Sequence, residues 1–396
     1  MSDVFGVPGW DASAWDRVLL ARSDIGRIGR DGDWVMYRPG RLVVDAAAAD
    51  DARVREVLRD GCATRADEPL CDTAARLGVT LFSAPDDRIV ELARRVRALA
   101  PGGASLDHVL VAGPSRWHGD DAPQPVADPG DVPGRGSAGA GISVLVLDTG
   151  VAPDVPFAVQ ARAGDAEVPD EDGDRRRDPP AGHGTHVCGI VARHAPAARL
   201  TARRVLTTVA GQVSELECAQ ALLDAAGFDL VNCSFGGPTL FDAPPLVVER
   251  ALARLAPSTV VVACSGNTGA TRPQWPAASK RCIAVGAIAR DPGGPWLRTD
   301  FSSHGPWVDC GAPGHLIDSA FLCWGDEGAS AAFDGWARWS GTSMSAPHVV
   351  GAIAALVAGR FLGWLWLDPV IAIVASLIIA RWAWTLMRNT ASVLLD

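Results

Sequence analysis

The chain has 396 residues, of which 48% are hydrophobic and 21% are charged, and its formal net charge is -10. These values exclude wholesale disorder and predict a globular protein of about two domains. An acidic chain with a sequence pI of about 5.3 also lacks the basic surface that binds a phosphate backbone, so we expect no nucleic-acid partner.

The nine cysteines are scattered along the chain, and no two of them form a C-x-x-C pair. Neither a disulfide framework nor a zinc site is indicated, and we expect the cysteines within apolar runs to be buried. Residues 1–30 have no basic start followed by an apolar stretch of the kind that a signal peptide needs. By this criterion we expect the protein in the cytoplasm.

The first part of the chain alternates between strand and helix patterns. Short apolar runs come before and after two segments with helical spacing, at residues 42–44, 50–59, 79–82, 86–99 and 108–111. This order predicts a small α+β domain over residues 1–112. Residues 113–141 are rich in Pro, Gly, Asp and Ala, which indicates a linker between two domains.

A larger domain is predicted over residues 142–357. Its strands are unbroken apolar runs separated by helical patterns, at residues 143–147, 230–231, 259–263 and 282–285. Strands that are apolar on both sides and alternate with helices are typical of a parallel sheet covered on both faces.

Three polar segments interrupt this domain. Asp148 ends the strand of ISVLVLDTG, His183 lies in GHGTHVCG, and Ser343 lies in GTSMSAPH before an apolar helix. A serine hydroxyl becomes a good nucleophile only beside a base, and an imidazole base needs a carboxylate to fix its tautomer. A helix N-terminus beside the serine would stabilise a developing oxyanion. The three segments together therefore indicate an acyl-transfer triad.

These segments resemble the Asp, His and Ser boxes of the subtilisin (S8) family of serine proteases, in that family's order. The resemblance covers about residues 140–357 and implies a three-layer α/β fold and a serine endopeptidase that works through an acyl-enzyme. It also implies that Asn267, in VVVACSGNTG, donates to the oxyanion. The segment VNCSFGG resembles the strand that pairs with substrate. The implied walls of the specificity pocket are Ser234, Phe235 and Gly236 on one side and Ala263, Cys264 and Ser265 on the other.

The resemblance also sets expectations for cofactors and partners. No cofactor is needed, and protein or peptide substrates are implied. Relatives often bind calcium, and an acidic cluster is a candidate site, although its spacing matches no calcium loop and a solvated charged loop is favoured. Its members are Asp165, Glu167, Asp170, Glu171, Asp172 and Asp174. We expect His186, Ser345 and His348 to pack rather than react. The α+β domain would be either a propeptide, acting as chaperone and inhibitor, or an accessory domain of another role.

The C-terminal segment departs from this pattern. Residues 356–396 resemble the last membrane-helix region of a cation diffusion facilitator, a metal/proton antiporter family, with an apolar tail over residues 358–396. Residues 369–387 are long enough to span a bilayer, with Arg381 towards one end and Trp382 and Trp384 as interface anchors. Membrane association through this tail is therefore expected, and the alternative is a buried helix that completes the protease domain.

Two other functions stay open from the sequence. The first is a non-catalytic binding module, in which the altered C-terminus leaves the triad unassembled. The second is a fragment of a cation-efflux membrane protein, which rests on the tail alone.

Overall fold

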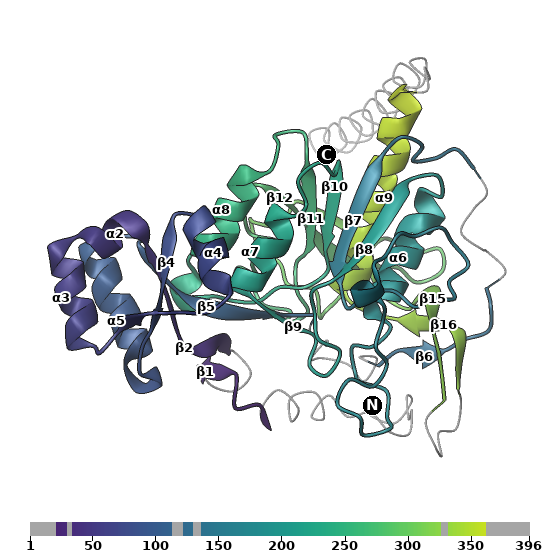
Figure 1. Cartoon of the computed structure of the whole chain (residues 1–396). Coiled ribbons are helices and arrows are strands. Elements are labelled where there is room, and N and C mark those ends of the chain that lie inside the picture. Colours follow the sequence, from purple (N-terminus) through teal and green to yellow (C-terminus); the bar gives the residue numbers. More distant parts are fainter. Residues whose placement is uncertain (1–20, 30–33, 113–121, 130–135, 326–331, 362–396) are drawn as a thin grey trace, which may run out of the picture.

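The structure is a computed structural model that describes residues 21–29, 34–112, 122–129, 136–325 and 332–361. Figure 1 shows a smaller N-terminal region in purple and blue beside a larger region in teal, green and yellow. The predicted C-terminal membrane segment, residues 369–387, lies outside the described residues.

The N-terminal region is an antiparallel sheet packed against helices. Its strand order is β3-β4-β2-β5-β9, with β1 beside β2. The helices expected at 50–59 and 86–99 are confirmed as α3 and α5, and a further short helix, α2, comes directly before α3. The elements are β1 (Gly26–Ile28), β2 (Val35–Asp45), α2 (Ala46–Asp50), α3 (Ala52–Asp60), β3 (Thr64–Arg65), α4 (Leu70–Arg76), β4 (Val79–Ser83), α5 (Asp86–Leu99) and β5 (Ala104–Val111).

The larger region contains a seven-stranded sheet of order β13-β12-β11-β10-β7-β8, with β14 beside β12. All of its pairs are parallel except β12 with β13. Its strands are β7 (Ser143–Asp148), β8 (Arg199–Arg204), β10 (Leu230–Cys233), β11 (Val260–Cys264), β12 (Cys282–Ala289), β13 (Leu297–Arg298) and β14 (Cys310–Pro313). The other elements are η1 (Ala163–Asp165), α6 (His183–His194), β9 (Gln212–Ser214), α7 (Glu215–Leu223), η2 (Leu240–Asp242), α8 (Leu246–Arg254) and α9 (Thr342–Phe361).

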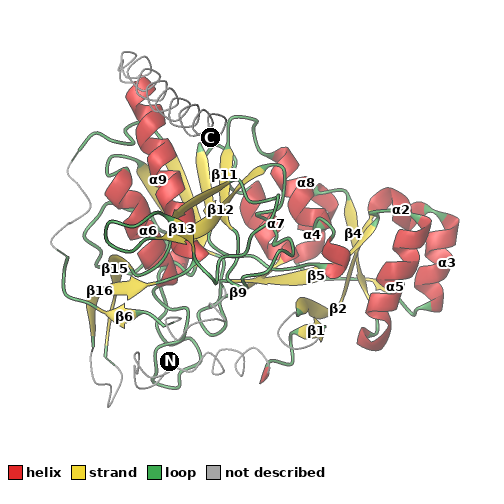
Figure 2. Cartoon of the chain, turned by 180° about the vertical axis from the view of Figure 1, so that it is seen from behind, coloured by secondary structure: helices red, strands yellow, loops and turns green. Residues whose placement is uncertain are grey.

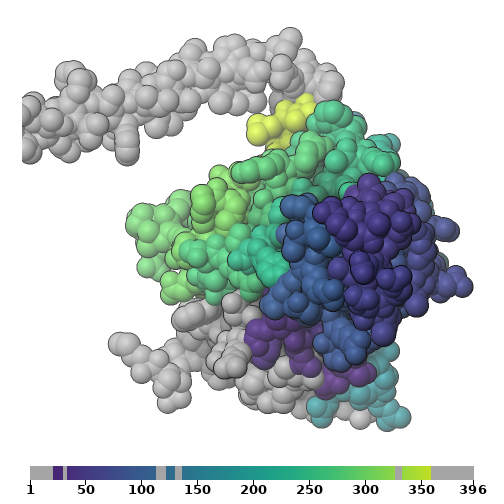
Figure 3. Space-filling model, turned by 90° about the vertical axis from the view of Figure 1, so that its left-hand side faces the viewer, coloured from purple at the N-terminus to yellow at the C-terminus, as the bar shows by residue number. Residues whose placement is uncertain are grey.

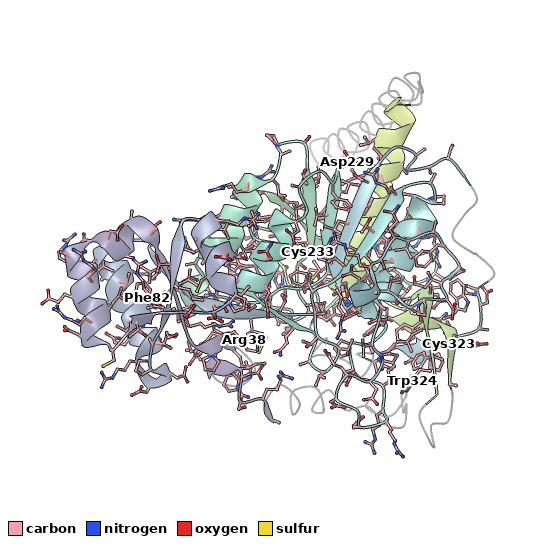
Figure 4. All side chains as sticks on the ribbon, viewed as in Figure 1. Arg38, Phe82, Asp229, Cys233, Cys323 and Trp324 are labelled. Atoms are coloured by element: carbon pink, nitrogen blue, oxygen red, sulfur yellow. The ribbon has the colours of Figure 1, made fainter. Side chains whose placement is uncertain are left out.

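Alternate residues of the central strands face two separate cores. Leu145 and Leu147 of β7 pack in one core with residues of α7 and α8, while Val144 and Val146 pack in the other with residues of α6 and α9. Figure 2 shows the sheet between these two helical layers, and the labelled Cys233 lies among the central strands in Figure 4. The predicted three-layer α/β fold with a parallel sheet is confirmed.

Two parts of the fold were not predicted. The strand β8 carries three arginines and reads as polar, yet it forms the edge of the sheet beside β7. The hairpin of β15 (Ile317–Trp324) and β16 (Phe333–Trp339) pairs with β6 (Gln124–Pro125), a short strand within the segment that was predicted to be a linker. Nothing local in the sequence marks that long-range pairing.

The two regions are joined through β5, which pairs with β9 on the larger region (Figure 1). Figure 3 shows the N-terminal region seated directly on the larger one. Asp107 of β5 is fully buried there, and its Oδ1 accepts from the backbone N–H of Leu216 in the first turn of α7 at 3.1 Å. Its Oδ2 accepts from Arg41 at 3.0 Å.

His108 extends this buried polar contact. Its Nε2 accepts from the backbone N–H of Leu240 at 2.9 Å, so the ring proton lies on Nδ1, which is 3.1 Å from a carboxylate oxygen of Glu215. Polar groups buried between two packed regions must find partners across the contact. Here the partners of Asp107 and His108 come from the larger region and are Leu216, Glu215 and Leu240. The position of β5 is therefore held by specific hydrogen bonds.

Asp107 makes the stability of the chain depend on pH. Burial raises the pKa of Asp107 to about 6, the negative charge of Glu215 acts in the same direction, and Arg41 opposes them. Because this folded-state pKa lies above the ordinary value of 3.8, the stability contributed by the group is present below about pH 4 and is lost as pH rises through about 6.

We therefore expect the Tm of the wild-type chain, relative to that of Asp107→Asn, to fall between pH 4.5 and pH 7.5. Thermal melts of both proteins at the two pH values measure this difference, and Asp87→Asn, at an exposed position on α5, serves as control. A wild-type-minus-variant difference that is the same at both pH values would contradict the expectation.

Candidate active site

Asp148 and His183 meet at the carboxyl end of β7. Asp148 is the last residue of that strand, and His183 is the first residue of α6, after Gly182 in a left-handed conformation (φ 91°). Both side chains are buried, and His183 Nδ1 lies 2.6 Å from Asp148 Oδ1. The backbone N–H of Thr149 donates to the same oxygen at 2.8 Å. A carboxylate at Nδ1 leaves Nε2 as the basic nitrogen of the ring.

Ser343 is the second residue of α9 and is buried. Its hydroxyl donates to the carbonyl oxygen of Ser234 at 3.0 Å, and the Ser234 hydroxyl donates to the Ser343 carbonyl oxygen at 2.9 Å. Among the described residues no hydrogen bond joins Ser343 to His183. Rotation about the Cα–Cβ bond of serine re-aims its hydroxyl at low cost, and catalytic hydrogen bonds often form only when substrate is present.

Asn267 lies beside the start of α9. Its Oδ1 accepts from the backbone N–H and from the hydroxyl of Thr342, both at 2.8 Å. These two bonds fix the amide group, and a Cβ added to Gly341 would lie 3.3 Å from Asn267 Nδ2. The amide nitrogen is therefore held next to the turn that presents Ser343.

The six residues expected to line a substrate pocket lie at the ends of two neighbouring strands: Ser234, Phe235 and Gly236 follow β10, while Ala263 and Cys264 end β11 and Ser265 follows it. β10 and β11 pair in parallel, with Cys233 opposite Ala263, so the segments that leave them start side by side. Ser343 touches both, through the Ser234 carbonyl and through Cys264 Sγ, which lies 3.9 Å from its Oγ. The Phe235 side chain is fully buried in the core beneath, so this residue can offer substrate only its backbone.

Three further polar residues near the site are packed, as expected. His186 is fully buried and its Nε2 lies 3.0 Å from the carbonyl oxygen of Ile317. Burial lowers the pKa of His186 to about 3, and the neighbouring His183 acts in the same direction. His348 pairs with His194 at 2.7 Å, between α9 and α6. The Ser345 side chain is buried where a Cβ on Gly314 would collide with it.

An aromatic contact with the imidazole of His183 was not predicted from the sequence. The rings of Trp339, at the end of β16, and His183 lie 5.3 Å apart between centroids and are nearly perpendicular, at 88°. Trp339 makes a similar contact with His186 at 6.0 Å. The hairpin thus covers one side of His183. The tryptophans that come just before the Ser343 segment indicate that an apolar strand lies there, but the sequence does not show that this strand contacts His183.

The acidic segment is not uniformly solvated, which corrects the expectation of one charged loop. Asp165 and Glu167 are buried, whereas Asp172 and Asp174 are exposed. The carboxylates of Asp170, Asp172 and Asp174 lie within 4.8 Å of one another. Such oxygens are ligands of the kind that Ca²⁺ prefers. Asp170 also accepts three backbone N–H groups of its own loop, from Gly173, Asp174 and Arg175.

The cysteines carry no disulfide, as expected from their spacing. All nine are free, and Cys188, Cys218, Cys233, Cys264 and Cys282 are buried. Burial raises the pKa of the Cys264 thiol to about 11, so this neighbour of Ser343 is held as a neutral thiol.

Comparison with known proteins agrees with this geometry. The profile of the subtilase family, peptidase S8, matches residues 139–380. Subtilisin Savinase from Lederbergia lenta is 34% identical over 243 residues, which cover 58% of this chain and 81% of that protein. Subtilisin E from Bacillus subtilis (strain 168) is 34% identical over 244 residues, covering 58% of this chain and 58% of that protein. The chain belongs to the subtilase family and is a serine-type endopeptidase of the subtilisin kind.

A solved structure extends the likeness in fold. The crystal structure of fervidolysin from Fervidobacterium pennivorans, a keratinolytic enzyme related to subtilisin, matches with a TM-score of 0.52 at 22% identity. The match covers 84% of this chain and 56% of that one, so the shared fold extends beyond the peptidase region.

The C-terminal expectation is not supported. The subtilase match continues to residue 380, past the end at residue 357 that the sequence motifs indicated, and no comparison supports a cation diffusion facilitator segment. Within the part of the chain that the structure describes, no helix is both long enough and apolar enough to cross a membrane.

Glycine at position 184 allows the two segments of the site to touch. A Cβ there would lie 2.2 Å from the carbonyl oxygen of Gly150 and 3.1 Å from the Cβ of Asp148. We expect Gly184→Ala to push α6 away from the Asp148 turn and to lower kcat by up to about 100-fold, the effect of a misplacement of about 1 Å. Peptide hydrolysis measured beside a thermal melt checks this.

The matched control is Gly164→Ala, because a Cβ there meets nothing within 4 Å. Alanine favours a helix over glycine by about 1 kcal/mol, so helix propensity alone would not damage the Gly184 variant. Wild-type turnover in Gly184→Ala would show that the close approach does not matter.

Proposed function

We propose that the peptidase reaction of this chain is carried out by Ser343, His183 and Asp148. The observation that carries the proposal is the 2.6 Å contact between His183 Nδ1 and Asp148 at the end of β7, with Ser343 at the start of α9. An imidazole fixed in this way presents a basic Nε2 to a serine nucleophile.

The reaction follows from these groups. Ser343 Oγ forms a bond to the peptide carbonyl carbon while its proton passes to His183 Nε2. The backbone N–H of Ser343 and Asn267 Nδ2 donate to the oxyanion, aided by the positive end of α9. The C–N bond then breaks, the amine leaves with the proton from His183, and water hydrolyses the acyl-enzyme by the same steps in reverse.

Asp148 supplies the electrostatic part of this mechanism. It is 1% exposed, so its charge acts on the imidazolium with little screening by water. It also holds the proton on Nδ1 at every stage, which keeps Nε2 available for exchange with Ser343 and with the leaving amine.

Substrate binding is proposed to use the backbone at Gly236 and the pocket between the two walls that were predicted. The support comes from the chain itself, because Val111, at the end of β5, pairs with the backbone of Gly236. The backbone N–H of Val111 donates to the Gly236 carbonyl at 2.9 Å, and the Gly236 N–H donates back at 3.0 Å. On the other side the Ala112 N–H donates to the Gly211 carbonyl at 2.8 Å.

An extended segment held between two edges in this manner is how a peptide adds to a sheet. The Leu110 side chain is fully buried in the core that contains Val213 and Phe235. We propose that the N-terminal region is propeptide-like and inhibits the peptidase, because its last residues occupy the place of a substrate strand. This favours the propeptide over an accessory domain of another role.

The non-catalytic binding module that the sequence left open is not supported, because the chain belongs to a family of serine endopeptidases. The Ser343 hydroxyl is bonded to Ser234 rather than to His183, so the assembly of the proposed triad needs its own test. A fluorophosphonate probe provides it, because only an activated serine reacts with it. Labelling that maps to Ser343 supports the triad, and folded protein that resists the probe after the N-terminal region is removed by limited proteolysis contradicts it.

Removal of the nucleophile is the direct test of the triad. We expect Ser343→Ala to lower kcat by about 10⁶, which is the loss measured for the nucleophile of subtilisin itself. Ser345→Ala, two residues along the same helix, is the control and should keep its turnover. Cleavage at a near wild-type rate by Ser343→Ala would remove this residue from the role.

Weakening the β5 contact tests the inhibitory role. Val111→Pro removes the N–H that donates to Gly236, a hydrogen bond worth about 0.5–1.5 kcal/mol. We expect the rate of fluorophosphonate labelling of the full chain to rise by roughly 2- to 13-fold, the Boltzmann equivalent of that energy. Val111→Ala keeps the N–H and should label at the wild-type rate. An unchanged rate in the proline variant would argue that residues 109–112 do not block the site.

A further inference from the structure

Glu167 is a buried carboxylate next to the catalytic pair that the mechanism does not use. It lies between β7 and α6, and its side chain is almost wholly buried, with 7% of the residue exposed. Its backbone N–H donates to the Val151 carbonyl at 2.9 Å, which places it alongside the turn that follows Asp148.

Its side chain reaches α6 through Thr185. The Thr185 hydroxyl accepts from the backbone N–H of Ala152 at 2.9 Å, so its proton is directed to Glu167 Oε2, also at 2.9 Å. Thr185 is fully buried and lies two residues after His183. These bonds join three segments: residues 165–167, the turn after Asp148, and the first turn of α6.

A second bond closes the same junction. The backbone N–H of Gly184 donates to the Thr149 hydroxyl at 2.9 Å. Thr149 and Thr185 therefore tie the Asp148 turn to α6 from either side of Gly184. The Thr185 hydroxyl gives its own proton to Glu167, and the Thr149 side chain and the Gly182 backbone also interact with this carboxyl group.

The placement of Glu167 is electrostatically unfavourable. Burial raises the pKa of Glu167 and the neighbouring Asp148 charge acts in the same direction, while hydrogen bonds from Thr149, from the Gly182 backbone and from Thr185 oppose them. Its Oε1 atom is buried without a hydrogen-bond partner among the described residues. An apolar residue would fill this space at lower cost, so packing alone does not explain a carboxyl group here.

We propose that Glu167 is a positioning residue of the active site, which holds the first turn of α6 against the Asp148 turn so that His183 stays within hydrogen-bond distance of Asp148. The inference rests on the proposed function of the triad. Glu167 acts through Thr185 and touches no reacting atom.

The test compares Glu167→Ala with Glu167→Gln, each folded as the full chain and then freed of the inhibitory N-terminal region by limited proteolysis. Gln is uncharged and has nearly the same shape, and its amide oxygen can accept the Thr185 hydroxyl proton, whereas Ala leaves that hydroxyl without an acceptor. Active sites are titrated with a fluorophosphonate, and kcat and KM for a peptide substrate are then expressed per titrated site. This removes any loss that is due only to unfolded protein.

We expect Glu167→Ala to lower kcat per site by roughly 10- to 100-fold, with KM within about twofold, and Glu167→Gln to stay within about threefold of wild type. Thr185→Val should also lower kcat, and the Thr185→Val/Glu167→Ala double variant should be no worse than Glu167→Ala alone, because the bond that Thr185→Val removes is already lost in Glu167→Ala.

Glu249→Ala is the matched control. Glu249 is a half-buried carboxyl group on α8 whose pKa is also raised by burial, but it lies away from the triad. The Glu249→Ala substitution should lower Tm without changing kcat per titrated site. If Glu167→Ala also lowers Tm and leaves kcat per site intact, or if Glu167→Gln is as impaired as Glu167→Ala, the proposal is overturned. A wild-type chain that still resists the probe after limited proteolysis has removed the N-terminal region would instead refute the proposed function.

Discussion

The hydrogen bond between Asp148 and His183 is the constraint on which the site depends, because it fixes both the tautomer and the orientation of the base. Two polar side chains, 1% and 5% exposed, are brought to 2.6 Å from opposite ends of a strand-to-helix connection of 34 residues, 149–182. That approach requires backbone contact between the Asp148 turn and α6, and therefore glycine at position 184, where any Cβ would meet the Gly150 carbonyl. The sheet provides the rest, since β7 is buried on both faces and cannot shift without disturbing two cores.

The same sheet edge that would bind substrate is used by the chain itself. Val111, the last residue of β5, exchanges two backbone hydrogen bonds with Gly236, and the next residue, Ala112, donates one to Gly211. Asp107 and His108 place buried polar groups against α7 and Leu240. Backbone pairing of this kind is independent of side-chain identity, whereas the buried polar contacts are specific. The two kinds of contact together hold β5 in a defined position against the larger region.

A feature of this structure could be predicted from the sequence where the residues that determine it lie close together along the chain. The helix α5 and the strand β7 were predicted because their apolar spacing is local, and Asp148, His183 and Ser343 were identified because each stands in a short motif. The contact of Trp339 with His183 and the burial of Glu167 were not predicted, because both depend on segments far apart in the chain or on the path of a loop. Glu167 in particular was assigned to a solvated acidic segment, since charge composition alone does not tell a buried carboxylate from its exposed neighbours.

Proton NMR of the full chain tests the central contact most directly. A proton held on His183 Nδ1 against a buried carboxylate should resonate far downfield of the amide region, and this signal should persist in Ser343→Ala but vanish in both Asp148→Asn and His183→Ala. The buried pair of His108 and Glu215 can give a second signal, which these two variants should leave in place. A folded protein with no downfield resonance sensitive to both Asp148 and His183 would contradict the arrangement of the site described above.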